Sequence, residues 1–195
     1  MAFFQWLIDL DIWLFSVFNR LPHPQILNQL FLFFSFYPLI IWSVICLVLI
    51  WLEEQKDRLF IIKFIMALGV AGIVVSGIIK PIVGRPRPDL QLETEIVVVN
   101  EKPALLFWNN DYAFPSGHAA IAFAGAYLLS KELKNKKRRL RLSVIFYTIA
   151  ALTAISRIYL GKHFPLDVTI GALIGVMVAS FTWQVIGKLV KVKKS

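Results

Sequence analysis

Apolar runs separated by short polar connectors dominate this chain of 195 residues. Runs long enough to cross a bilayer as helices lie at about residues 26–52, 59–84, 141–161 and 166–188. About 20 apolar residues span the hydrocarbon core. A fifth run, 116–131, is shorter than this, so its ends would reach the interface or the bilayer would thin around it. The pattern predicts an all-α polytopic membrane helix bundle of about five transmembrane helices in a single domain.

Residues 3–19 are also apolar, but Asp9 and Asp11 interrupt them. A charge at the centre of a bilayer costs several kcal/mol, so these residues fit a transmembrane position poorly. We expect an amphipathic helix that lies in the membrane interface, where Trp6 and Trp13 are suited to the depth. A sixth span over the same residues is the alternative.

Composition agrees with a membrane protein and argues against a nucleic-acid partner. Hydrophobic residues make up 58% of the chain, and its mean hydropathy is +0.69. The net charge of +9 would suit nucleic acid, but the basic residues mostly occupy short connectors between apolar runs, which is typical of membrane topology. The predicted partner at this point is the bilayer, with no nucleic acid and no oligomeric state assigned.

The basic residues also predict which side of the membrane each connector faces. With five spans, fourteen of the 21 lysines and arginines fall on one side. They are Lys56, Arg58, Lys63, Lys131, Lys134, Lys136, Lys137, Arg138, Arg139, Arg141, Lys188, Lys191, Lys193 and Lys194. The positive-inside rule makes that side cytoplasmic, so the remaining connectors face away from the cytoplasm.

Three polar clusters interrupt the apolar sequence, and all three fall on this extracytoplasmic side. They are Lys80–Pro88 (KPIVGRPRP), Pro115–His118 (PSGH) and Ser156–Asp167 (SRIYLGKHFPLD). Together they supply cations, a Ser-Gly pair that can open a helix, two histidines and a carboxylate. Phosphoryl transfer through a histidine needs this set, because a phosphate requires neutralising cations, a nucleophile and a proton donor for the leaving oxygen.

The clusters resemble the three-part signature of the type 2 phosphatidic acid phosphatase superfamily. That signature reads Lys-x6-Arg-Pro, Pro-Ser-Gly-His and Ser-Arg-x5-His-x3-Asp, and residues 80–167 fill every defined position in order. The match covers under half of the chain, but three motifs at set spacings are far more specific than one. The resemblance implies a membrane enzyme that hydrolyses phosphate groups on lipids.

The predicted phosphate-binding residues are Lys80, Arg87, Ser116, Gly117 and Arg157. The resemblance implies that Lys80 and Arg87 bind the substrate phosphate. Ser116 is a plausible N-cap, and the N–H groups and dipole of the helix that it opens favour an anion. Arg85 lies outside the signature, and we interpret it as a cation that reaches lipid headgroups.

The predicted catalytic residues are His163, His118 and Asp167. His163 is the expected nucleophile, and Asp167, four residues later, is expected to hydrogen-bond its ring and stabilise the phosphohistidine. His118 is the expected proton donor to the leaving group. We expect neither cofactor nor metal, because fixed cations supply the positive charge and no cluster has metal-ligand spacing. His23 lies far away along the chain.

Residues 89–114 form the longest extracytoplasmic loop and contain two apolar patches, IVVV and ALLFW. We expect a flap that rests on the membrane surface over the site, with a structured connector as the alternative.

The expected substrate is a lipid phosphate or diphosphate, because a site where spans leave the bilayer can bind a headgroup while the lipid tail stays in hydrocarbon. In its compact size and outward-facing site, the chain resembles bacterial undecaprenyl diphosphate phosphatases. The first-ranked expectation is therefore an enzyme of the bacterial cytoplasmic membrane that converts undecaprenyl diphosphate to undecaprenyl phosphate. Phosphatidylglycerophosphate, phosphatidate and lipid A phosphatases are alternatives with the same signature. More remote are a vanadium haloperoxidase-like enzyme, which the spans disfavour, and a non-catalytic scaffold or transporter.

Overall fold

The structure is a computed structural model that describes residues 2–36, 38–52, 58–92, 96–99, 112–133 and 135–192. Within these ranges the chain is mainly helical, with one isolated β-bridge between Pro86 and Tyr112. The elements are α1 (Ala2–Asn19), α2 (Gln25–Phe36), α3 (Pro38–Leu52), α4 (Arg58–Gly72), the π-helix η1 (Ile73–Ile79), α5 (Lys80–Val83), α6 (Pro88–Gln91), α7 (Gly117–Glu132), α8 (Lys136–Tyr159) and α9 (Pro165–Val192). The predicted all-α class is confirmed.

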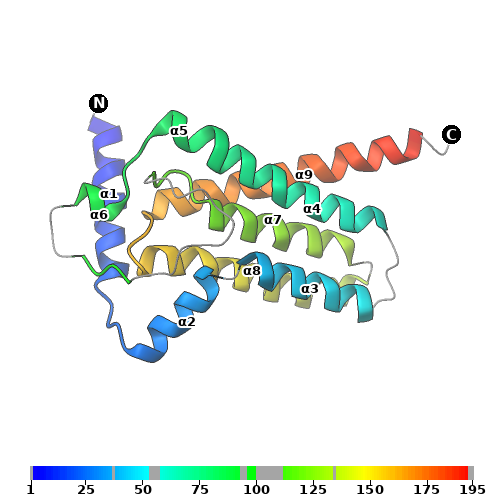
Figure 1. Ribbon diagram of the computed structural model, residues 1–195, viewed down its shortest axis with the longest axis horizontal. Coiled ribbons are helices and arrows are strands. Elements are labelled where there is room, and N and C mark those ends of the chain that lie inside the picture. The colour runs from blue at the N-terminus through cyan, green and yellow to red at the C-terminus, as the bar shows by residue number, and fades with distance from the viewer. Residues whose placement is uncertain are drawn as a thin grey trace.

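Helix α7 lies at the centre of the bundle. It packs against α3, α4, α8 and α9, and the long helices run roughly side by side (Figure 1). Its side chains are small: five fully buried alanines, Ala119, Ala120, Ala122, Ala124 and Ala126, are spread along it. Small residues let helix backbones approach closely, which favours helix association inside a membrane.

Two glycines of α9 show how close this approach is. A Cβ atom on Gly171 would lie 2.4 Å from the carbonyl oxygen of Ser116, and one on Gly175 would lie 2.1 Å from that of Ala120. On the other side of α7, a Cβ on Gly125 would lie 2.8 Å from the ring of Trp42 in α3. The Gly171-x3-Gly175 spacing is a small-residue motif for helix packing, and our sequence analysis missed it.

By length and composition, three helices of the described residues can cross a membrane: Phe60–Val83, Lys136–Tyr159 and Pro165–Lys188. The predicted span 26–52 is not one straight helix, because Gln25–Ser35 and Ile40–Val48 meet at 71°. Taken together, this bent pair would be a fourth span. The predicted span 116–131 corresponds to α7, whose 16 residues are short for a full crossing. Its central position explains why it can be short, since other helices surround it.

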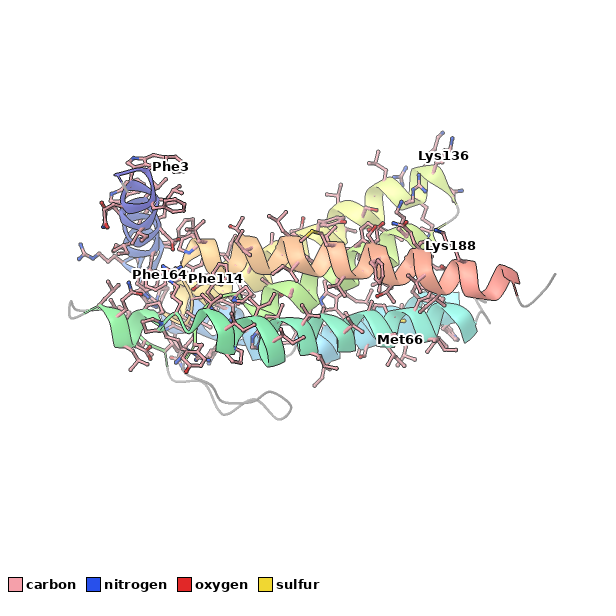
Figure 2. The ribbon with its side chains drawn as sticks, turned by 90° about the horizontal axis from the view of Figure 1, so that it is seen from above. Phe3, Met66, Phe114, Lys136, Phe164 and Lys188 are labelled. Atoms are coloured by element: carbon pink, nitrogen blue, oxygen red, sulfur yellow. The ribbon has the colours of Figure 1, made fainter. Side chains whose placement is uncertain are left out.

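The three polar clusters meet at one end of the bundle. Helix α5 ends there, while α7 and α9 begin there (Figure 1). Phe114 and Phe164, next to the second and inside the third cluster, lie at this end, whereas Lys136 and Lys188 lie toward the opposite end (Figure 2). The structure therefore separates the polar clusters from the basic connectors along the length of the bundle.

Helix α1 crosses the end that carries the clusters, at a steep angle to the long helices (Figure 1). Its aromatic side chains Phe3, Phe4, Trp6 and Trp13 are more than half exposed, whereas Asp11 is only 2% exposed. This placement suits the predicted interfacial helix, because the apolar side chains are available to the bilayer and the charged one is turned into the protein.

Candidate active site

The first cluster follows a change in helix type. Residues 59–84 were predicted as one regular helix, but η1 interrupts it, and the N–H of Lys80 bonds to the carbonyl of Val75, five residues earlier. A π segment changes the direction of every later side chain, and such segments are frequent at functional sites. Gly84 then ends α5 with a φ of +61°, a conformation that glycine adopts readily. The Lys80 ammonium is buried and donates a hydrogen bond of 2.9 Å to the carbonyl of Tyr112.

The second cluster opens α7 as predicted. Ser116 is the N-cap, and its Oγ accepts a bond of 3.5 Å from the N–H of Ala119. The backbone N–H of Ser116 donates to the carbonyl of Asp167 at 2.9 Å, so the start of α7 is tied to the first turn of α9. Gly117 faces η1, because a Cβ there would lie 3.2 Å from the Oγ of Ser76.

The third cluster turns the chain from α8 into α9. Gly161 follows the end of α8 with a φ of +76°, a left-handed conformation that glycine favours after a helix. The N–H of His163 returns to the carbonyl of Arg157 at 3.1 Å, so these two side chains share one tight turn. Both are almost fully buried, at 1% and 3% exposure, and the guanidinium of Arg157 bonds to the hydroxyl of Ser35 in α2.

Electrostatics shows that the clusters converge on the two histidines. Burial, followed by the charges of Lys80, Arg157 and Arg87, holds the pKa of His163 well below its ordinary value of 6.5. The same three cations and His163 itself are the electrostatic neighbours of His118. The His163 ring is therefore neutral at physiological pH, with a lone pair available for attack beside three positive charges.

Asp167 lies near His163, but not in the arrangement that we expected. Its Oδ2 is 3.7 Å from His163 Nδ1, which is too long for a hydrogen bond. Oδ2 instead accepts the N–H of Phe164 at 2.8 Å, and Oδ1 accepts a bond of 2.8 Å from Arg85 Nη1. These partners hold the carboxylate just short of the ring. Within the described part of the chain, His163 Nδ1 has no hydrogen-bond partner.

The sequence analysis misplaced Arg85 and missed Asp11. Arg85 does not extend to lipid headgroups: its side chain is 18% exposed and bridges Asp167 and Asp11, with its Nη2 at 2.7 Å from Asp11 Oδ2. A signal for Asp11 was present. A carboxylate in an otherwise apolar segment is costly and often has a partner, but this signal does not say which cation the partner is.

His23 also lies closer to the clusters than its sequence position suggested. Its ring stacks on Tyr159 of the third cluster with 4.1 Å between centroids. It contacts the Asn19 carbonyl at 2.9 Å and Asn28 Oδ1 at 3.2 Å. These contacts join the end of α1 to α2, so His23 has a packing position outside the pair of catalytic candidates.

Only part of the predicted flap belongs to the described residues. Asn19 brackets Val97, accepting its N–H at 2.8 Å and donating to its carbonyl at 2.8 Å. Residues 96–99 are therefore attached to the end of α1 and to the turn at Gly161, where a Cβ would lie 2.6 Å from the Val97 carbonyl oxygen. Residues 93–95 and 100–111, with the ALLFW patch, lie outside the described residues, so the flap stays a prediction.

In the ranges that the structure describes, no three His, Cys, Asp or Glu residues are grouped so that they could hold a metal ion. The polar side chains that converge at this end of the bundle are mainly cations and histidines. Such a site suits a phosphate group.

Comparison with known proteins identifies the class to which this site belongs. The model of the PAP2 superfamily matches residues 59–191, so it includes all three clusters. The chain belongs to this superfamily and is a membrane-embedded hydrolase of phosphate esters.

Individual relatives extend over nearly the whole chain. A Bacillus licheniformis protein named bacitracin transport permease protein BcrC is 31% identical, over 93% of this chain and 83% of its own. An undecaprenyl-diphosphatase of Sulfolobus acidocaldarius is also 31% identical, over 87% of this chain and 77% of its own. The crystal structure of Aquifex aeolicus LpxE is 30% identical and superposes with a TM-score of 0.69, over 90% of this chain and 95% of the other.

Proposed function

We propose that this protein removes a terminal phosphate from a lipid phosphate or diphosphate through a phosphohistidine at His163. The observation that carries the proposal is a buried, neutral histidine beside Lys80, Arg87 and Arg157. A neutral imidazole is a nucleophile, and fixed cations stabilise the charge on the equatorial oxygens during phosphoryl transfer. The three cations, with Ser116, Gly117 and the N–H groups at the start of α7, bind the phosphate.

The first displacement uses the ring nitrogen that points away from Asp167. Nδ1 faces Asp167 Oδ2 at 3.7 Å, so Nε2 attacks phosphorus while the bond from phosphorus to the leaving oxygen breaks. His118 donates its proton to that oxygen. The phosphohistidine ring carries a positive charge that Asp167 stabilises, and a modest closing of the 3.7 Å gap would complete an Nδ1–H hydrogen bond.

The second displacement releases phosphate and restores the enzyme. His118, now neutral, accepts a proton from water, and the water oxygen bonds to phosphorus as the bond to Nε2 breaks. We propose that both steps proceed without a divalent metal, because three fixed cations already face the phosphate position. The arrangement provides positive charge, nucleophile and proton carrier from the chain itself.

Undecaprenyl diphosphate is the substrate that we propose first. The site is at the end of a membrane bundle, where a diphosphate headgroup can bind while the polyprenyl tail stays in the bilayer. The name of the Sulfolobus acidocaldarius relative supports this choice. Phosphatidylglycerophosphate, phosphatidate and lipid A remain the alternatives, because each would present a phosphate group to the same residues.

We further propose that the protein resides in a bacterial cytoplasmic membrane with its site on the extracytoplasmic side. The positive-inside rule supports this orientation, since the basic connector before α8 and the basic end of α9 lie away from the clusters (Figure 2).

Phosphate release from purified lipids in detergent tests this function. We expect release from undecaprenyl diphosphate to exceed that from phosphatidylglycerophosphate, phosphatidate and lipid A, and to persist in excess EDTA. Loss of activity in EDTA that magnesium restores would contradict the metal-free mechanism. Absence of release from every lipid of the panel would contradict the function itself.

A further inference from the structure

We propose that Arg85 and Asp11 are positioning residues that hold Asp167 against His163, so that α1 is part of the active-site framework. This inference rests on the proposed function, in which Asp167 stabilises a phosphohistidine at His163. Neither Arg85 nor Asp11 is a defined position of the signature.

Arg85 binds two buried carboxylates with the two ends of one planar group. Its Nη1 is 2.8 Å from Asp167 Oδ1, and its Nη2 is 2.7 Å from Asp11 Oδ2. Its Cζ lies 4.1 Å from the centroid of the Phe164 ring, so this ring also restricts the movement of the guanidinium. Because the guanidinium is rigid and planar, the position of one carboxylate determines that of the other.

Asp11 attaches α1 to the start of α9 by a second contact. Its Oδ1 accepts the backbone N–H of Leu166 at 2.7 Å, while its Oδ2 accepts Arg85. Leu166 precedes Asp167 directly, and Asp11 is 2% exposed. One carboxylate of α1 therefore holds both the backbone next to Asp167 and the cation that binds its side chain.

These contacts fix the position of the Asp167 carboxylate beside the His163 ring. Arg85 and the Phe164 N–H occupy both oxygens of Asp167, so the carboxylate cannot rotate away from the ring. The carbonyl of Arg85 also accepts the N–H of Ala113 at 2.7 Å, and the backbone of Ala113 interacts with the His163 ring. Loss of the Arg85 side chain would release the Asp167 carboxylate, whereas the contact to Ala113, which uses the Arg85 backbone carbonyl, would remain.

Arg85 also balances charge around the nucleophile. The charged and titratable groups near His163 are Lys80 of α5, Arg87 before α6, His118 of α7, Arg157 of α8 and Asp167 of α9. Arg85 neutralises the only carboxylate in this set. Without it, Asp167 would stabilise the protonated imidazole and raise the pKa of His163.

The test measures phosphoenzyme formation against pH for the full-length protein in detergent. For the natural protein, the rate should fall as pH drops through the pKa of His163, at a pH below 6.5. Arg85→Gln should lower the rate roughly 10- to 100-fold, as loss of an orienting partner commonly does, and should move this acid limb to higher pH. Arg85→Lys should leave the limb in place and recover only part of the rate, because one ammonium cannot bind both carboxylates in the fork geometry.

Asp11→Asn should also lower the rate without weakening substrate binding, so kcat should fall while KM changes little. The matched control is Asp9→Asn on the same helix, where the exposed carboxylate bonds only to Gln5 in the described structure, and it should leave the rate unchanged. Because Asp11 acts through Arg85, the double variant should lose less than the product of the two single losses.

Three results would overturn the inference. They are an unshifted acid limb in Arg85→Gln, equal rates for the Asp9 and Asp11 variants, and independent losses in the double variant. A drop in melting temperature without a moved limb would show that Arg85 only stabilises the fold. Failure of the natural protein to form a phosphoenzyme would instead contradict the proposed function, so the two ideas fail separately.

Discussion

At the scale of single residues, the two histidines of the clusters differ in their surroundings in a way that matches their proposed roles. Both rings have Lys80, Arg87 and Arg157 as electrostatic neighbours, and His163 has in addition the Asp167 carboxylate at 3.7 Å. That carboxylate would favour a positive phosphohistidine at His163. At His118, the second residue of α7, the cations would favour release of a proton to the leaving oxygen.

Leaving groups of different quality separate the two roles. His163→Ala should abolish both the phosphoenzyme and turnover. His118→Ala should lose the contribution of a general acid, about 100- to 10,000-fold for a lipid substrate, but should recover in part with p-nitrophenyl phosphate, whose leaving group needs no proton. Rescue at position 163 with none at 118 would show that the roles are exchanged.

At the scale of elements, the site depends on how closely α9 approaches α7. The backbone contact at Gly171 lies next to Ser116, and Ser116 donates its N–H to the carbonyl of Asp167. The same contact therefore places the start of α7, where we propose that the phosphate binds, beside the third cluster. Small residues in α7 and α9 thus control a distance on which the proposed site depends.

Gly175→Ala tests this close packing. The added Cβ would lie 2.1 Å from the Ala120 carbonyl oxygen, so the helices must separate, at a cost of about 1–3 kcal/mol. The melting temperature in detergent should fall. Gly187→Ala is the matched control in the same helix, because nothing lies within 4 Å of its Cβ, and it should be neutral or slightly stabilising. Equal melting temperatures for the two variants would contradict the close approach.

At the scale of the whole molecule, the basic connectors and the polar clusters of the site lie at opposite ends of the bundle. Lys136 and Lys188 lie far from Phe114 and Phe164 (Figure 2), and α1 crosses the end with the clusters (Figure 1). The molecule is therefore polarised along its length, which is the property that orients a membrane protein.

Single cysteines at the two ends test the orientation. In a Cys46→Ser background, which removes the only native thiol, Asp89→Cys in α6 should react with a membrane-impermeant maleimide in intact cells. Lys136→Cys at the start of α8 should react only after permeabilisation. Both positions are exposed, so access to the reagent distinguishes them. The reverse labelling pattern would place the site on the cytoplasmic side.

The sequence alone determined the all-α membrane class, the clusters at positions 80–88, 115–118 and 156–167, and the helix start at Ser116. The membrane class and the helix start follow from local rules, namely apolar length and helix capping. The motif spacing identified the family because three motifs at set spacings are far more specific than one.

Only the tertiary structure decided which groups touch. Asp11 and Arg85 are distant in the chain, and no local rule pairs a carboxylate of the first helix with a cation before α6. The 71° bend between α2 and α3, the π-helix before Lys80 and the 3.7 Å separation of Asp167 from His163 likewise depend on packing. Periodicity shows which residues are apolar along one helix, but contacts between helices are set by the shapes and charges that meet when the bundle closes.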